Sequence, residues 1–148
     1  MTGQLLYPEI FQEGDLFLKE TALYVQQLTK IMTVTITYYD RGGWKKSFVG
    51  PEFGGTSLPR ILYRAVSQRG AYIDVEDCLK HPSYKFINLD VNYPMIRFIA
   101  CLPINNQQGT IIGAITLMDR KPKKIASVTL SSLEIISKMV CFHMHSAK

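Results

Sequence analysis

The stretch that decides the fold reads RFIACLPI at positions 97–104, NNQQG at 105–109 and TIIGAITLMD at 110–119. It predicts two strands joined by a polar turn, because both outer runs are rich in β-branched and aromatic residues, which suit a half-buried sheet surface. Asn and Gly in the turn tolerate the backbone angles of a hairpin. Gly113 interrupts the second run, and we expect a helix to pack very close to it.

The segments on either side of this hairpin alternate between helical and extended periodicity. Apolar residues recur at helical spacing in three segments, whereas Ile31 to Tyr39 alternates apolar and hydroxyl-bearing side chains, as strands with two different faces do. Residues 1–13 show no period and are expected to form an arm, followed by one domain over 14–148. Helices are expected over 16–31, 58–69 and from Ser127 or Ser131 to the C-terminal end, and strands over 31–39, 44–49 and 71–75.

Composition places the chain among ordinary globular proteins. It has 148 residues, of which 47% are apolar and 20% charged, so one domain with a substantial core is expected. It contains no apolar run long enough for a membrane span. The three cysteines, Cys78, Cys101 and Cys141, are an odd number and favour a reducing compartment, hence a cytoplasmic location. The net charge of +5 comes without an aromatic and basic stacking motif, so no nucleic acid is expected as a partner.

The first and last predicted helices each carry two apolar stripes. Leu16–Ile31 has a wide stripe, and Leu133–Met144 has one row containing Leu133 and another containing Ile135. A helix that is apolar on two sides is usually buried on two sides. One side should meet the sheet, and the other side needs either the other terminal helix or a second subunit.

The order of these elements resembles the GAF domain, a sensory relative of the PAS domain. The resemblance rests on AYIDVED at 71–77, His81-Pro82, the run from Tyr93-Pro94 through Ile104, and the run from Gly109 to Asp119 with its closing aspartate. It implies an α+β fold with a central antiparallel sheet of five or six strands. The terminal helices would cover one face, and the helix at 58–69 with a long lid loop at 76–95 would cover the other.

The resemblance also implies a regulatory domain of bacterial signal transduction. A small ligand would bind between sheet and lid, and the signal would pass through the terminal helices, which many GAF domains use to form homodimers. The alternative is a GAF fold that binds no ligand and serves as a dimerisation or protein-interaction module. A free methionine sulfoxide reductase is less favoured, since Cys78 is the only cysteine in the lid loop. We therefore do not expect an enzyme.

Successive side chains of a strand point to opposite faces of the sheet, and this alternation predicts which of them line the expected pocket. If Gly113 faces a helix, its neighbours Ile112 and Ala114 face the opposite side, where a pocket of hydroxyls and small residues with Arg97 at its rim would suit a small polar or anionic ligand. The candidate ligand-binding residues are Thr33, Thr35, Thr37, Tyr84, Tyr93, Arg97, Ile99, Cys101, Ala114 and Thr116. The other interpretation is that the threonines face solvent on an open sheet and that Arg97 forms a surface ion pair.

No metal or cofactor is expected. Cys141 and His145 lie four residues apart on the last predicted helix, with His143 nearby, but two ligands at this spacing are too few for a structural metal site. The motifs typical of cyclic-nucleotide-binding and bilin-binding GAF domains are absent. No phosphate-cradling glycine-rich motif and no catalytic triad occurs either.

Overall fold

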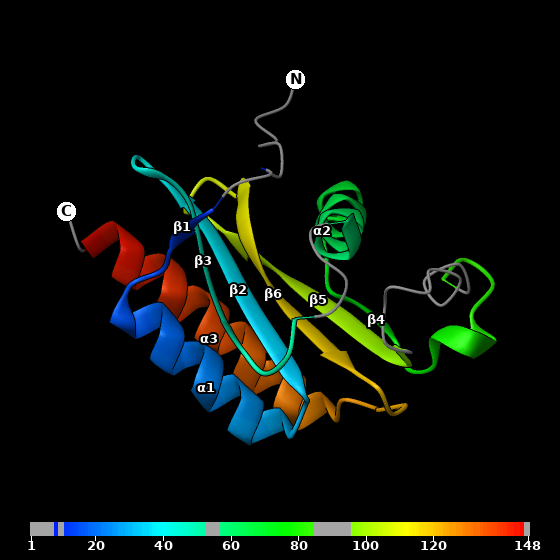
Figure 1. Ribbon diagram of the computed structural model, residues 1–148. Coiled ribbons are helices and arrows are strands. Elements are labelled where there is room, and N and C mark those ends of the chain that lie inside the picture. Colours follow the sequence, from blue (N-terminus) through cyan, green and yellow to red (C-terminus); the bar gives the residue numbers. More distant parts are fainter. Residues whose placement is uncertain (1–7, 9–10, 53–56, 85–95, 147–148) are drawn as a thin grey trace.

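A computed structural model of the chain describes residues 8, 11–52, 57–84 and 96–146. Its centre is a six-stranded sheet with the order β1-β3-β2-β6-β5-β4 (Figure 1). The strands are β1 (Gln12–Glu13), β2 (Thr33–Asp40), β3 (Gly43–Val49), β4 (Ile73–Val75), β5 (Phe98–Asn105) and β6 (Ile111–Asp119). The helices are α1 (Leu16–Thr29), α2 (Ser57–Arg69), α3 (Ser127–Ser146) and the short 3-10 helix η1 (Cys78–Lys80).

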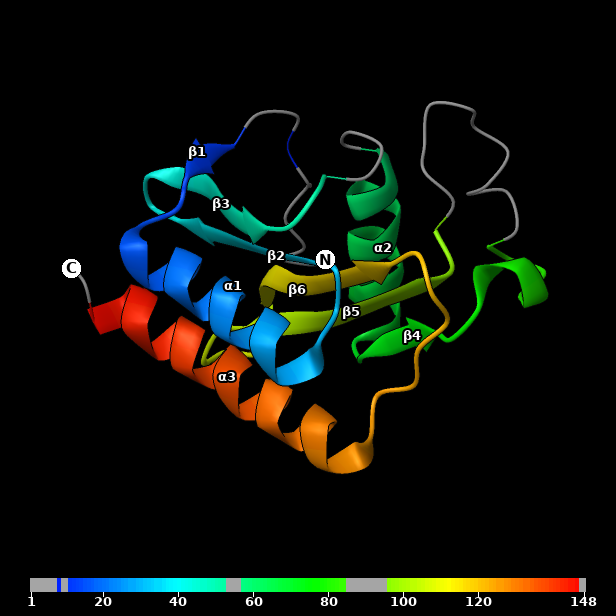
Figure 2. The same cartoon turned by 60° about the horizontal axis from the view of Figure 1, so that its bottom comes forward.

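The sheet separates the helices into two layers. Helices α1 and α3 lie side by side and antiparallel on one face, and α2 lies on the other face (Figures 1 and 2). This arrangement confirms the α+β fold class expected from the sequence. One detail differs, because Gln12 and Glu13 pair in parallel with Lys45 and Lys46 of β3. Part of the expected arm is therefore an edge strand, and the sheet is mixed, although most of its pairs are antiparallel.

The organising hairpin is formed as expected, with β5 and β6 paired antiparallel from Phe98 opposite Asp119 to Asn105 opposite Ile111. The expectation that a helix packs very close to Gly113 was wrong. Gly113 lies opposite Tyr38 of β2, and a Cβ atom placed on it would lie 2.1 Å from the carbonyl oxygen of Thr37. The close neighbour is thus the backbone of the adjacent strand and not a helix.

Helix α1 begins and ends with local backbone signals. The carboxylate of Asp15 caps its start by accepting a hydrogen bond from the Leu18 N–H at 2.9 Å, as short polar side chains at this position do. Lys30 ends the helix in the left-handed conformation with φ of 58°.

No helix in the described part of the chain is long and apolar enough to cross a membrane.

Each face of the sheet has its own core. The core under α1 and α3 contains Val34, Ile36 and Tyr38 of β2 together with Leu18 of α1 and Val140 of α3. The second core lies under α2, and its buried residues are Trp44, Leu62, Tyr63, Val66, Ile73, Val75, Cys78, Ile96, Ile99, Cys101, Ala114 and Met118. The long apolar strands β5 and β6 contribute to both cores, because successive side chains point to opposite faces.

Asp119, the last residue of β6, joins three segments of the chain. Asp119 is 4% exposed, and its carboxylate accepts hydrogen bonds from the Met32 N–H at 2.9 Å and from the Lys121 N–H at 3.0 Å. Its backbone carbonyl accepts a hydrogen bond from the Arg97 N–H at 3.0 Å. The entry to β2, the approach to β5 and the loop after β6 are therefore held at one end of the sheet.

Candidate functional site

The threonines of β2 lie on the sheet face that α2 covers. Val34, Ile36 and Tyr38 face α1 and α3, so the alternating residues Thr33, Thr35 and Thr37 face α2. All three threonines are buried. They do not face solvent on an open sheet, so this part of the second interpretation is wrong.

A polar row crosses the middle of this face. Thr35 of β2 lies opposite Thr116 of β6, and Thr116 lies opposite Cys101 of β5. The Thr116 Oγ1 and Cys101 Sγ atoms are 3.6 Å apart, a weak contact for a hydroxyl. Thr35 is 7% exposed, and its hydroxyl has no hydrogen-bond partner among the described residues. Because a hydroxyl can both donate and accept a hydrogen bond, the Thr35 hydroxyl in this row is available to a polar group of a ligand.

The flanking threonines use their hydroxyls within the protein. Thr33 Oγ1 donates to the Pro51 carbonyl at 2.5 Å, and Thr37 Oγ1 donates to the Ala114 carbonyl at 3.5 Å. These two hydroxyls fix the strand and the segment after β3. Of the predicted threonines, Thr35 and Thr116 therefore remain the candidates for direct ligand contact.

Alternation along β5 and β6 places the side chains on the predicted faces of the sheet, with one exception. Ile99, Cys101 and Ala114 belong to the core under α2, as expected. Ile112 instead packs in the core under α1 and α3, while Ile111 packs against the core under α2. Ile104 of β5 lies opposite Gly113, but the next residue, Asn105, lies opposite Ile111. Ile112 is therefore an extra residue in β6, and such an irregularity changes which face the neighbouring side chains point to.

Arg97 forms an ion pair at the surface, as the other interpretation of the sequence expected. Its guanidinium makes two hydrogen bonds of 2.7 Å to the carboxylate of Asp77, through Nε and Nη2. These hydrogen bonds lower the pKa of Asp77 and raise that of Arg97. Arg97 faces a hollow at the end of the sheet, between η1 and the loop after β6, and its charge is already paired.

The two predicted lid tyrosines have different outcomes. Tyr84 packs against the core under α2, and its ring meets that of His81 edge to face with a centroid distance of 5.1 Å. Tyr93 lies outside the described residues. The structure thus brings together seven of the ten candidates on the α2 face, namely Thr33, Thr35, Thr37, Ile99, Cys101, Ala114 and Thr116, with Tyr84 at its margin.

Sequence reasoning missed an aromatic cluster on the same face. The ring of Trp44 in β3 meets Tyr63 of α2 edge to face at 5.6 Å and Phe11 at 6.1 Å, and it lies 5.7 Å from Tyr39. The Tyr63 hydroxyl also donates to the Ile111 carbonyl at 3.3 Å. The cluster links α2 to the β2–β3 turn. A signal was present, since Trp44 is the only tryptophan in the chain and follows a Gly-Gly turn.

All three cysteines are buried and free. Burial raises the pKa of Cys78 to about 11 and that of Cys101 to about 12, and it also raises the pKa of Cys141. The thiols therefore stay protonated near neutral pH, whereas nucleophilic and metal-binding cysteines react as thiolates. The described residues contain no group of three or more His, Cys, Asp or Glu side chains that could hold a metal ion.

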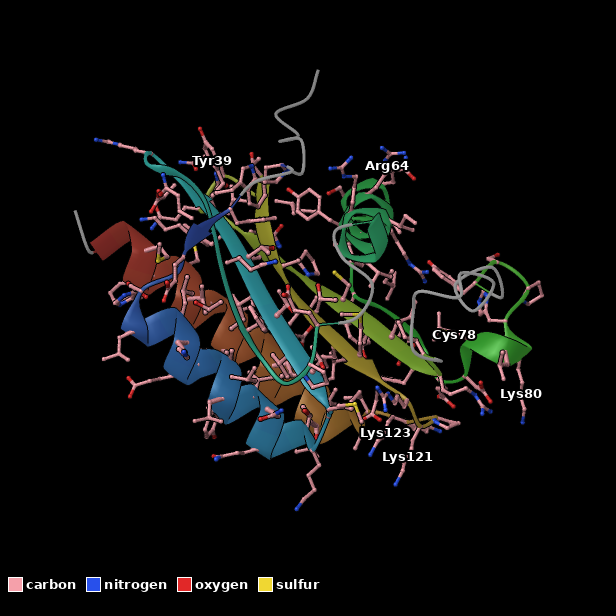
Figure 3. The ribbon with its side chains drawn as sticks, in the orientation of Figure 1. Tyr39, Arg64, Cys78, Lys80, Lys121 and Lys123 are labelled. Atoms are coloured by element: carbon pink, nitrogen blue, oxygen red, sulfur yellow. The ribbon has the colours of Figure 1, made fainter. Side chains whose placement is uncertain are left out.

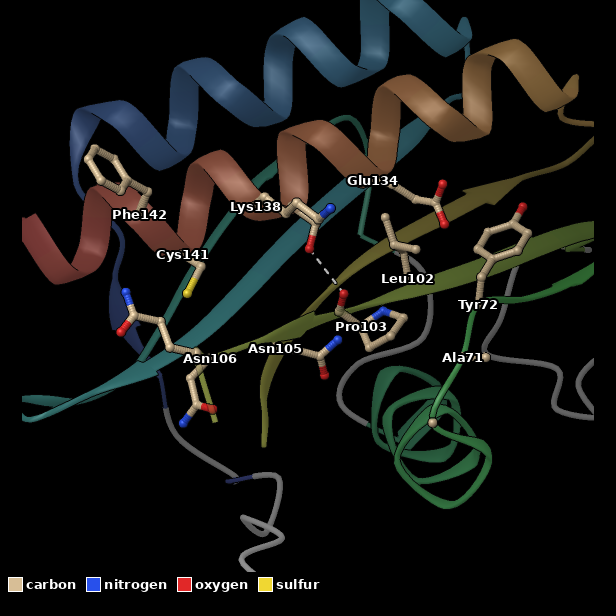
Figure 4. Close-up of a pocket in the computed structure, with 13 residues that line it drawn as sticks. Ala71, Tyr72, Leu102, Pro103, Asn105, Asn106, Glu134, Lys138, Cys141 and Phe142 are labelled. Atoms are coloured by element: carbon tan, nitrogen blue, oxygen red, sulfur yellow. Dashed lines mark hydrogen bonds between the residues drawn. The ribbon is translucent and has the colours of Figure 1, made fainter. Parts of the chain in front are cut away.

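A second hollow of about 640 Å³ lies at the opposite face, beside the end of β5 (Figure 4). Glu134 and Lys138 of α3 lie on one side of it, and Tyr72 and Asn105 lie on the other (Figure 4). Ser137 donates a hydrogen bond of 3.1 Å to the Pro103 carbonyl at its floor. The hollow exists because the short strand β4 pairs only with Ile99–Cys101 and leaves the rest of this β5 edge without a described strand partner.

The outer surface of α1 and α3 carries an apolar groove of about 480 Å³. Tyr24 of α1 is 57% exposed there, and Ile135 and Met139 of α3 are 60% and 54% exposed. Glu20 is the only charged residue among those that line the groove. The second apolar stripe of α3 predicted from the sequence is thus present, and α1 does not cover it.

Comparison with known proteins identifies this architecture. No protein-family profile matches the sequence, and no curated protein matches it either. Solved structures do match the fold. The GAF domain region of a Geobacter sulfurreducens PCA protein superposes with a TM-score of 0.70 at 14% identity, over 90% of this chain and 93% of that one. The type II free methionine-R-sulfoxide reductase of Thermoplasma acidophilum gives 0.66 at 17% identity, over 88% and 90%.

A third similar structure is the blue-light absorbing form of the PixJ GAF domain from Thermosynechococcus elongatus, with a TM-score of 0.64 at 9% identity over 88% of this chain and 83% of that one. At these identities the similarity establishes architecture and not activity. The fold is shared by sensory and signalling domains and by free methionine-R-sulfoxide reductases. With its sheet order, its two helical layers and this set of neighbours, the chain has the fold of GAF domains.

Proposed function

We propose that the chain is a cytoplasmic regulatory domain of bacterial signal transduction that binds a small polar ligand between the sheet and α2. The observation that carries this proposal is the Thr35–Thr116–Cys101 row, which lies in a buried face and leaves the Thr35 hydroxyl without a described partner. A ligand group that accepts or donates one hydrogen bond would satisfy it. The surrounding apolar side chains, such as Leu62 and Ile99, would exclude water.

The strands that line the site also support α1 and α3, which gives a route for the signal. Ile36 follows Thr35 on β2, and Ile115 precedes Thr116 on β6. Both isoleucines pack in the core under the terminal helices. The hydrogen bond from Ser137 to Pro103 ties α3 directly to β5. A ligand that prefers one spacing of β2, β5 and β6 would therefore also favour one position of α3.

We propose that α1 and α3 pass this movement to a second copy of the chain, which packs against them. The groove of α1 and α3 exposes Tyr24, Ile135 and Met139, and large exposed apolar surfaces usually mark interaction sites. A two-fold dimer brings the same surface of both copies together, so one contact covers both apolar faces. The sparse charge of the groove favours an apolar partner surface of this kind.

The ligand site is tested by native mass spectrometry of the purified protein, followed by a thermal-shift screen of small polar metabolites. We expect an adduct or a stabilising compound, and we expect Thr35→Val with Thr116→Val to abolish it, since valine keeps the shape and removes the hydroxyls. Thr110→Val, at the hairpin turn, is the matched control. A clean mass and an unresponsive panel would favour the alternative, a dimerisation module without a ligand.

The dimer is tested by sedimentation velocity of Ile135→Glu beside the control Leu79→Glu. Both changes place a carboxylate at an exposed apolar position, but only Ile135 lies in the groove. We expect Ile135→Glu to yield monomers and Leu79→Glu to leave dimers. A folded Ile135→Glu protein that is still dimeric would place the interface elsewhere.

The reductase alternative is less favoured by the cysteines. A thiol reductase needs an accessible thiolate, and burial raises the pKa of Cys78 and Cys101 far above neutral. Turnover of free methionine sulfoxide by the purified protein would reverse this preference.

A further inference from the structure

A hollow of about 660 Å³ at the β4 end of the sheet collects basic side chains from two separate loops. Lys80 comes from η1, and Lys123 and Lys124 come from the loop between β6 and α3. Figure 3 shows Lys80, Lys121 and Lys123 at the same end of the molecule. None of Lys80, Lys123 and Lys124 forms an ion pair with another described residue.

Several contacts hold these two loops in place. The Lys123 N–H donates to the Glu76 carbonyl at 3.2 Å, so the loop after β6 is bonded to the segment that leads into η1. The Cys78 N–H donates to the Arg97 carbonyl at 2.6 Å, and the Arg97 guanidinium binds Asp77 at 2.7 Å through two nitrogens. The lysines therefore project from a cross-linked frame, which reduces the entropy lost when they bind a ligand.

The charge in the hollow is positive after all described pairs are counted. Asp77 is matched by Arg97, and Glu76 is the other acidic residue of the lining. Three lysines against one glutamate leave a net charge of +2 with His81 neutral. A ligand with at least two negative charges would fit this balance.

His81 adds a directed donor. Its Nδ1 accepts a hydrogen bond from the Ser83 N–H at 3.3 Å, so the neutral ring carries its proton on Nε2. His81 lines the same hollow as the lysines. An imidazole N–H beside several ammonium groups is a combination that suits phosphate oxygens, which accept several hydrogen bonds at once.

We propose that this hollow is a binding site for a small, multiply charged phosphate anion, separate from the ligand site under α2. The volume lies in the range of small-molecule pockets, and lysines from two separate loops line one open hollow. Lys123 and Lys124 supply most of the attraction, and Arg97 keeps the frame in place through Asp77. The site does not depend on the ligand proposed for the Thr35 row.

The test is isothermal titration calorimetry of the full chain with sodium pyrophosphate at about 0.05 M salt, where charges about 10 Å apart still interact. We expect saturable binding of about one pyrophosphate per chain, because the hollow is one site. The test variant is Lys123→Ala with Lys124→Ala. The control is Lys45→Ala with Lys46→Ala, which removes the same charge from lysines that are paired with Asp40 and Glu52.

The two double variants have equal net charge, so they separate a site from general attraction. The proposal predicts binding about ten-fold weaker for the Lys123 and Lys124 variant, as loss of two near-surface charge contacts implies, and binding within about two-fold of the parent for the control. Absence of saturable binding by the parent protein would overturn the proposal. An equal loss in both variants would overturn it too, since binding would then follow net charge alone.

Discussion

Replacing Asp119 by alanine should strongly destabilise the fold without touching either proposed ligand site directly. The residue is 4% exposed, and its carboxylate accepts hydrogen bonds from the N–H groups of Met32 and Lys121 at 2.9 and 3.0 Å. Alanine has no acceptor, so both N–H groups lose their charged partner. Because Asp119 and Met32 are 87 residues apart, the change also releases the entry to β2 from the end of β6.

The expected magnitude follows from the two hydrogen bonds. A hydrogen bond to a charged group contributes about 1.5–3 kcal/mol net, and water replaces the partner where the donor is exposed. Lys121 is exposed, so its bond counts for only about 0.5–1 kcal/mol, while the bond to Met32 counts in full. The free energy of unfolding should therefore fall by roughly 2–4 kcal/mol, which for a chain of this size lowers Tm by roughly 5–12 °C.

The assay is urea unfolding followed by the fluorescence of Trp44, the only tryptophan, together with a thermal melt. Asp74→Ala is the matched control, since Asp74 is exposed and accepts one hydrogen bond of 3.3 Å from the Tyr72 hydroxyl. It should change the free energy of unfolding by less than about 0.5 kcal/mol, as exposed substitutions do. Asp119→Asn should be destabilising as well, because an amide offers one acceptor oxygen for two N–H groups. An Asp119→Ala protein within about 0.5 kcal/mol of the parent would refute the reasoning.

Three further predictions concern the backbone, the pH dependence and the thiols. Gly113→Ala should lower the free energy of unfolding by about 1–3 kcal/mol in urea titration, since its Cβ would lie 2.1 Å from the backbone carbonyl oxygen of Thr37. The control is Gly42→Ala, whose Cβ would meet nothing closer than the Asp40 Oδ1 atom at 3.3 Å, and an equal loss in both variants would contradict this. Burial raises the pKa of Asp15, but the Leu18 N–H and His143 outweigh it and lower the pKa below 3.8, so Asp15 contributes stability above that pH and loses it as the pH falls further. Asp15→Asn, which keeps the cap, should cost at most about 1 kcal/mol at pH 7 and nothing at the acid end, and a cost independent of pH would argue against it. The three thiols should react with a disulfide reagent slowly at pH 7.5 and fast in urea, because burial raises the pKa of each; fast labelling of the folded chain would show an accessible thiolate.

The candidate site was only partly predictable from the sequence. Alternation along β2 correctly placed Thr35 on the face opposite α1 and α3, because side-chain direction in a strand is a local property. Alternation also placed Cys101 and Ala114 correctly. It failed at Ile112, because β6 has one extra residue at this point relative to β5, which interrupts the period of two, and no local pattern marks that irregularity.

The sequence by itself determined the elements: the hairpin of β5 and β6, the amphipathic helices and the burial of alternate strand residues. These follow from periodicity, turn residues and caps, which act over a few residues. Tertiary structure alone decided which distant groups meet. Arg97 meets Asp77, Asp119 meets Met32, and Lys80 shares a hollow with Lys123. These contacts depend on strand order and on how loops cross at the sheet ends, and such relations between remote segments leave no trace in local spacing.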